Sequence, residues 1–148
     1  MIRWIVAALH LLALGVGLGV VWARGRALHG VLDAQGLRRV FYADNLWGMA
    51  AGVWIATGLA RAFAGLEKGS AYYLHNHAFW TKMTLLGLVL LLEVWPMASL
   101  IRWRIRYARG EDIDTRRAGV LAGISVAQAG LVIAMVFAAT AMARGLGY

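Results

Sequence analysis

The chain has 148 residues, of which 61% are hydrophobic and 15% are charged, and its formal net charge is +8. A soluble domain is roughly 45–50% apolar and about 25% charged, and a disordered chain is less hydrophobic still. Both classes are therefore excluded. Nucleic-acid binding is excluded as well, because arginines that flank membrane spans explain the positive charge. The absence of cysteine excludes disulfides, iron–sulfur clusters and thiolate chemistry.

Four stretches are apolar enough to cross a membrane, which takes about 20 residues of helix. They are 4–23, 45–66, 78–101 and 118–143. The second contains Arg61, and the third contains Lys82, Glu93 and Pro96, of which the proline is expected to kink or end the helix. The pattern predicts an all-α fold, an integral membrane four-helix bundle that forms a single transmembrane domain over residues 1–148.

The basic residues of the loops are distributed unevenly. Four arginines lie in the first connection (Arg24, Arg26, Arg38 and Arg39). Six lie in the third (Arg102, Arg104, Arg106, Arg109, Arg116 and Arg117), which makes ten on one side. The other side has Arg3, Lys68 and Arg144. Because positive charge stays in the cytoplasm, we expect both termini to face outward.

The first connection, residues 24–44, allows two arrangements. Its apolar residues are spaced so that part of it could lie on the membrane as an amphipathic helix. Alternatively, the second helix starts early, near Asp33, whose side-chain oxygen could cap the helix N-terminus.

Several ionisable side chains lie at membrane depth, where each is a functional candidate by default. His10 shares a helix face with Ala13 and Gly17, a stripe of small residues that predicts a helix contact and a side chain inside the bundle. The topology brings five candidates into the outer third of the membrane: His10, Arg61, Lys82, His75 and His77.

Glu93 lies eleven residues beyond Lys82, or roughly 16–17 Å along the helix, which is too far for a direct pair. We expect it to bond across the bundle to one of Trp54, Asn45 or Gln128, or to arginines at the inner surface.

The candidate residues match the requirements of haem b, whose iron takes imidazole and whose propionates take cations. His10 would be one axial ligand, Arg61 would hold a propionate, and His77, His75 or a neutral Lys82 would be the second ligand. Structural interpretations stay open beside this one. His10 could be a hydrogen-bonded core histidine, Arg61 and Lys82 could reach the surface by snorkelling, and the other two histidines could be ordinary loop residues.

Six motifs carry a resemblance over nearly the full length: HLLAL from His10, LRR from Leu37, ADNLWG from Ala43, ATGLAR from Ala56, YLHNHAFWTK from Tyr73 and AMARG from Ala141. With these motifs the chain resembles a bacterial inner-membrane family known as domain of unknown function 2214. The resemblance implies a multi-pass protein of the bacterial cytoplasmic (inner) membrane, which puts both predicted outward termini on the periplasmic side.

The arrangement is also loosely similar to the HemJ-type membrane protoporphyrinogen oxidases and the CopD-like copper-resistance proteins. These are small bundles with an early histidine and a later basic residue. The HemJ likeness implies bound haem b with a lysine near it, which His10 and Lys82 would match.

Three functions follow as hypotheses. The first is a haem b protein for electron transfer or porphyrin oxidation. The second is a non-enzymatic subunit that contacts a larger membrane complex, or a homo-oligomer, through GxxxG pairs. These pairs are Gly15 with Gly19, Gly48 with Gly52, and Gly119 with Gly123. The third is copper or zinc handling by His10, His75 and His77 from the periplasmic side.

Overall fold

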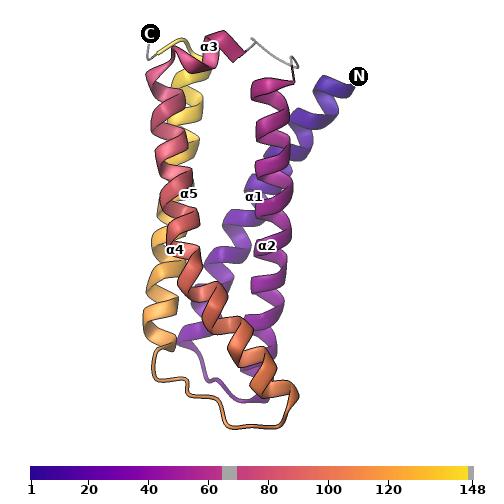
Figure 1. The fold of residues 1–148 in the computed structure, drawn as a ribbon, viewed down its shortest axis with the longest axis vertical. Coiled ribbons are helices and arrows are strands. Elements are labelled where there is room, and N and C mark those ends of the chain that lie inside the picture. Colours follow the sequence, from indigo (N-terminus) through magenta and orange to yellow (C-terminus); the bar gives the residue numbers. More distant parts are fainter. Residues whose placement is uncertain (65–69, 147–148) are drawn as a thin grey trace.

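The computed structural model describes residues 1–64 and 70–146, which contain helices and no strand (Figure 1). The helices are α1 (Ile2–His29), α2 (Ala34–Phe63), α3 (Ser70–Leu74), α4 (His77–Ala108) and α5 (Ala118–Ala143). The all-α prediction is confirmed, and the four long helices are each long and apolar enough to cross a membrane. Helices α1, α2 and α4 begin before the predicted spans, and α1 and α4 also end after them. The end of the predicted span 45–66, at residues 65 and 66, lies outside the described residues, as does Lys68.

The second helix starts early because Asp33 caps it. The Asp33 side chain accepts a hydrogen bond of 2.7 Å from the backbone N–H of Gly36. Helix α2 begins at Ala34, the residue directly after Asp33. An N-cap of this kind satisfies one of the N–H groups that a helix leaves without a partner. The early start is therefore confirmed, and the amphipathic surface helix is wrong, because its residues are divided between α1, α2 and the short connection between them.

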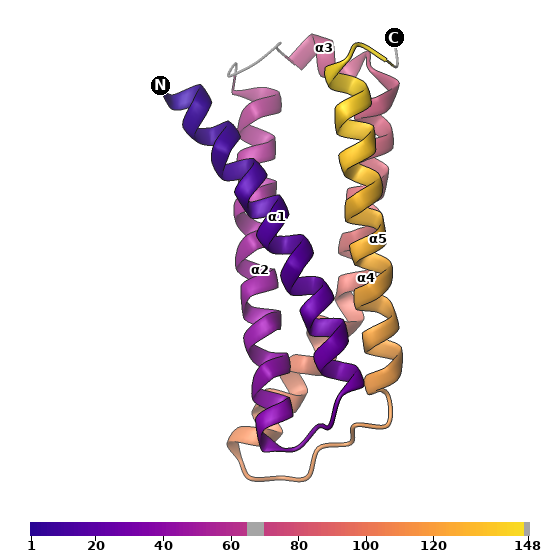
Figure 2. The same cartoon turned by 180° about the vertical axis from the view of Figure 1, so that it is seen from behind.

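The four long helices form two pairs. Helix α1 packs against α2, α4 packs against α5, and contacts between α1 and α5 join the pairs. Both termini and α3 lie at one end of the bundle, which we call the terminal end (Figures 1 and 2). The connections 30–33 and 109–117 lie at the other, which we call the connection end.

Helix α4 is continuous through Pro96 and changes direction along its length (Figure 1). Proline has no N–H to donate and its ring displaces the preceding turn, so a bend is expected there. The helix does not end at the proline, so that alternative is wrong, and the change of direction of α4 agrees with a kink. Below the bend, α4 leaves α5 and crosses toward α2, where Leu100 and Trp103 pack with Leu37 and Val40.

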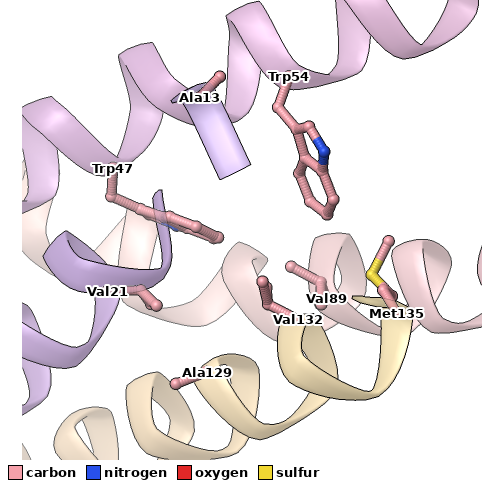
Figure 3. Packing of buried hydrophobic residues seen from close by; sticks show 8 residues of the cluster. All are labelled: Ala13, Val21, Trp47, Trp54, Val89, Ala129, Val132 and Met135. Atoms are coloured by element: carbon pink, nitrogen blue, oxygen red, sulfur yellow. The ribbon is translucent and has the colours of Figure 1, made fainter. Parts of the chain in front are cut away.

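The buried apolar residues of the described chain form three clusters. The central one contains Trp47 and Trp54 of α2, Val89 of α4 and Met135 of α5, with α1 residues against them (Figure 3). A second cluster closes the connection end. A small third cluster near the terminal end contains Ala62, Tyr73 and Phe79. Between the central and third clusters the two helix pairs do not close on each other, and the cavity described below lies there.

The close helix contacts do not use the predicted GxxxG pairs. A Cβ built on any of those six glycines meets nothing within 4 Å, so they make no close helix contact inside this chain, and their contact with a partner stays a prediction. The contacts use other glycines instead. A Cβ on Gly17 would lie 3.4 Å from Trp47, and one on Gly25 would lie 3.3 Å from Ser125.

Gly36 is required where the chain turns from α1 into α2, because a Cβ there would overlap the carbonyl oxygen of Val31. We expect Gly36→Ala to lower the free energy of unfolding by about 1–3 kcal/mol, the usual cost of overpacking. Thermal unfolding in detergent, followed by circular dichroism, measures this. Gly48→Ala is the matched control, since its Cβ meets open space and alanine favours a helix. Equal melting temperatures for the two variants would contradict this account of the turn.

Candidate functional site

Arg24 is the centre of a polar network inside the bundle. The sequence pattern placed it in a loop, but it lies within α1 and its side chain is fully buried. Its guanidinium donates to both carboxylate oxygens of Glu93, at 2.8 and 2.9 Å, and to Asp44 at 2.7 Å. It also donates to Ser125 at 3.0 Å and to Gln128 at 2.8 Å, so one side chain ties α1 to α2, α4 and α5.

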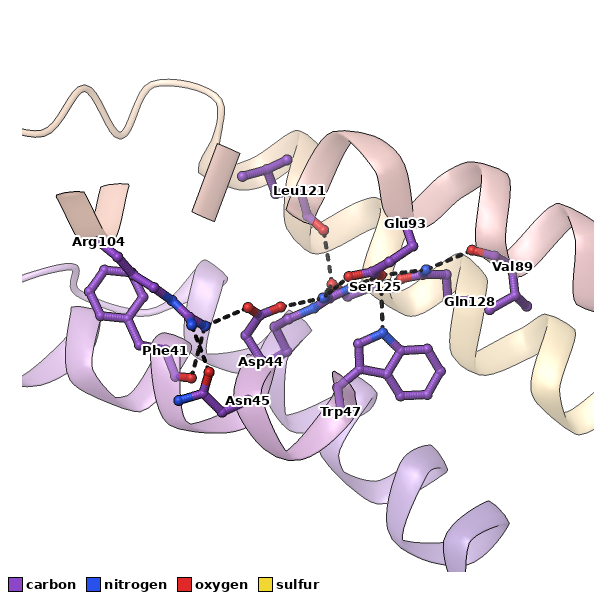
Figure 4. A network of polar contacts seen from close by, with 11 residues as sticks. Phe41, Asp44, Asn45, Trp47, Val89, Glu93, Arg104, Leu121, Ser125 and Gln128 are labelled. Carbon is purple, nitrogen blue, oxygen red and sulfur yellow. Dashed lines mark hydrogen bonds and ion pairs between the residues drawn. The ribbon is translucent and has the colours of Figure 1, made fainter. Parts of the chain in front are cut away.

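A second arginine completes the charge balance. Arg104, on the part of α4 beyond the bend, donates to Asp44 at 2.6 Å, to Asn45 at 2.6 Å and to the carbonyl oxygen of Phe41 at 3.2 Å (Figure 4). Two guanidinium groups and the carboxylates of Asp44 and Glu93 therefore meet with no net charge. Buried charges persist only where they are paired and hydrogen-bonded in this way.

The predicted partners of Glu93 are partly correct. Gln128 donates to Glu93 at 2.8 Å, and an arginine contacts it, as expected. Trp54 and Asn45 do not bond to it, and the indole N–H of Trp47 does, at 3.0 Å (Figure 4).

A signal for Arg24 was present in the sequence. The buried positions of α1 run from His10 through Ala13, Gly17, Val21, Arg24 and Leu28 at steps of three and four residues, which is one face of a helix. The predicted span 4–23 ends just before Arg24, so the last two positions of this stripe, Arg24 and Leu28, fall outside it.

A cavity of about 390 Å³ opens between the two helix pairs toward the terminal end. All five helices contribute to its lining, which is mostly apolar and aromatic. Three of the five predicted site residues line it: His10, Arg61 and Lys82. Arg61 lies in the last turn of α2, and Lys82 lies in the second turn of α4, so both cations are near the terminal end.

His10 belongs to the deep part of this lining, and both of its ring nitrogens contact residues of α2. The indole N–H of Trp54 donates to its Nε2 at 3.2 Å, so the proton of a neutral imidazole is on Nδ1. Nδ1 lies 3.1 Å from the carbonyl oxygen of Trp54 and 3.0 Å from the Thr57 hydroxyl. The ring fits because residue 58 is glycine, where a Cβ would lie 3.1 Å from the imidazole. The prediction that His10 points into the bundle is confirmed.

The other two predicted site residues lie elsewhere. His75 is exposed in the turn before α4, and its Nδ1 lies 2.8 Å from the carbonyl oxygen of Ala71. His77 is the exposed first residue of α4. Neither lines the cavity that contains His10. Across the described part of the chain, no group of three histidine or carboxylate side chains is arranged to hold a metal ion.

Aromatic residues lie at the end of the cavity that α3 covers. Tyr72 and Tyr73 of α3 and Phe79 of α4 line it, and the Tyr72 hydroxyl donates to the carbonyl oxygen of Met142 at 3.1 Å. This bond links α3 to the end of α5. Asn76 starts α4 by accepting a hydrogen bond from the backbone N–H of Phe79, and Lys82 lies in the second turn of the helix that begins there.

We expect Arg24→Leu to lower the free energy of unfolding by about 3–5 kcal/mol, because it leaves the Glu93 carboxylate without its cation and Asp44 with Arg104 alone. Arg116→Leu is the matched control, since that side chain is 88% exposed and its loss costs at most about 1 kcal/mol. The double variant Arg24→Leu/Glu93→Leu should recover part of the loss. Chemical unfolding in mixed micelles measures all three, and a double variant less stable than Arg24→Leu would contradict the charge-pairing explanation.

Comparison with known proteins agrees with this architecture. The family described as "Predicted membrane protein (DUF2214)" matches residues 2–147, almost the whole chain. No curated protein and no solved structure matches it. The comparisons therefore give no support to the looser likeness to HemJ-type or CopD-like proteins. With four helices able to cross the bilayer, this is a multi-pass membrane protein. The chain belongs to the DUF2214 family of predicted membrane proteins.

Proposed function

We propose that the protein binds, within the membrane, a molecule that has an apolar body and an anionic group. The observation that carries the proposal is the cavity itself, in which Arg61 and Lys82 come from different helices and share a mostly apolar and aromatic lining. Its volume, about 390 Å³, is within the range of small-molecule sites, which runs from roughly 300 to 1,000 Å³.

The charged residues of the cavity lie toward the terminal end, and its deeper lining is mostly apolar. Arg61 is seven residues, or roughly 10 Å of helix, nearer the terminal end than Trp54. The deep lining consists of Leu14, Leu86 and Met135 together with the His10 and Trp54 rings, which satisfy each other's polar atoms. A ligand with its charge at one end and an apolar body of about this length matches both regions.

We expect a brominated fatty acid to bind about tenfold or more tightly than its methyl ester, because a hydrogen bond to a charged group contributes about 1.5–3 kcal/mol. Quenching of tryptophan fluorescence by the bromine atoms reports occupancy near Trp54. The double variant Arg61→Gln/Lys82→Gln should remove the preference for the acid.

The matched control for that experiment is Arg3→Gln/Arg144→Gln. It removes the same number of charges at the same end of the bundle, from exposed residues that do not line the cavity. Equal affinity of the wild-type protein for acid and ester would overturn the proposal.

Haem b is a second and more specific candidate, favoured by the presence of His10 beside two cations. Arg61 suits a propionate, and the apolar lining suits the ring. The imidazole suits it less well, because His10 would have to exchange its bond from the Trp54 N–H for iron. Lys82 lines the cavity and could be the second ligand, whereas His75 and His77 do not line it. Bound haem would supply electron transfer or porphyrin oxidation.

The haem candidate predicts a Soret band in the purified protein and sharp α and β bands after reduction with dithionite. His10→Ala should abolish these bands, and His29→Ala, which changes an exposed histidine at the other end of α1, should leave them intact. A protein that stays colourless after expression with a haem precursor would eliminate haem and leave the amphiphile proposal standing.

A further inference from the structure

The cavity is open to the side, toward the lipid. Three residues that line it also have large exposed fractions: Leu11 of α1 (62%), Leu59 of α2 (52%) and Phe63 of α2 (53%). Side chains that face both the cavity and the outside mark its rim. Since these apolar residues belong to helices that cross the bilayer, the rim meets lipid rather than water.

The two-pair arrangement explains the side opening. Helix α1 contacts both α2 and α5, and α4 contacts α5. The close approach of Gly25 of α1 to Ser125 and Val126 of α5 lies toward the connection end. Toward the terminal end α1 diverges from α5 (Figure 2). The cavity is therefore a slot between the pairs, and α3 with Tyr72 and Tyr73 lies across its end.

We propose that the occupant of this slot is a phospholipid with an anionic headgroup, which enters sideways from the leaflet at the terminal end. This inference rests on the proposed binding function and names its ligand class. The headgroup phosphate lies at Arg61 and Lys82, and one acyl chain extends toward Trp54 and Met135. The second chain stays in the bilayer, which only a slot open to the side permits.

The position of the cations supports a ligand from the membrane. Arg61 and Lys82 lie near the ends of their helices, and long basic side chains at such positions reach the depth of the lipid phosphates with their stems in apolar surroundings. Guanidinium and ammonium groups both bind phosphate, and guanidinium can do so through two parallel hydrogen bonds.

The test is photo-crosslinking in vesicles, with a diazirine on one acyl chain of phosphatidylglycerol and crosslinked residues mapped by mass spectrometry. We expect crosslinks at Met135 and Leu86, which line the slot. Phosphatidylcholine with the same diazirine has no net charge and should label lipid-facing residues such as Phe137, which is only two positions from Met135 and is 72% exposed.

Variants establish what the crosslinks mean. Arg61→Gln/Lys82→Gln should reduce phosphatidylglycerol crosslinks at Met135 severalfold and leave those at Phe137 unchanged. Arg3→Gln/Arg144→Gln should change neither. Because the label at Phe137 is an internal reference on the same helix, a variant that fails to fold is recognised by loss of the normal Phe137 pattern. In that case the crosslinks at Met135 and Phe137 are measured in the single variant Lys82→Gln instead of the double variant.

One further probe separates failure of this inference from failure of the proposed function. If octyl phosphate carrying a diazirine labels Met135 and phosphatidylglycerol does not, the cavity binds anionic amphiphiles that arrive from water, and side entry of lipid is wrong. If neither anionic probe labels Met135 more than phosphatidylcholine does, both proposals fail.

Discussion

A single buried guanidinium determines how this bundle closes. Arg24 is fully buried and donates to side chains from three other helices, and a lone charge at that depth would be costly to keep inside a membrane protein. The helices must therefore converge around residue 24, with Glu93 and Asp44 brought to it and Arg104 satisfying the remaining oxygen of Asp44. The central apolar cluster lies next to this network, since Trp47 belongs to both.

Closure at one end leaves the other end open. The bend at Pro96 sends the second half of α4 toward α2, where Arg104 and Trp103 make contacts that a straight helix beside α5 would not reach. The first half of α4 remains with α5, and α1 remains with α2. The cavity between the pairs is thus a by-product of the same proline and the same charge network that hold the connection end together, and its depth ends where Trp54 and His10 bond to each other.

Sequence patterns were sufficient for the parts of the structure that depend on one helix at a time. Runs of apolar residues predicted four helices, and the Asp33 cap gave the correct start for α2 as one of two alternatives. The stripe through Ala13 and Gly17 correctly predicted that His10 points into the bundle.

Prediction failed where the structure depends on contacts between segments that are far apart in the sequence. Arg24 was assigned to a loop because its partners are 20 to 104 residues away. Of the candidate site, the common depth of His10, Arg61 and Lys82 could be predicted, but the exclusion of His75 and His77 depends on the turn before α4.

The Arg24 network also constrains the order in which the chain can assemble during synthesis. When only α1 and α2 have emerged, Asp44 is the one acidic partner within reach, and Ser125 and Gln128 are made more than a hundred residues after Arg24. The nascent α1 can leave its charged end at the membrane surface, because residue 24 is near the end of that helix. The second carboxylate, Glu93, is made with α4, so both acidic partners of Arg24 are present before α5. The last helix then adds two neutral acceptors, Ser125 and Gln128, which complete the hydrogen bonds of the guanidinium.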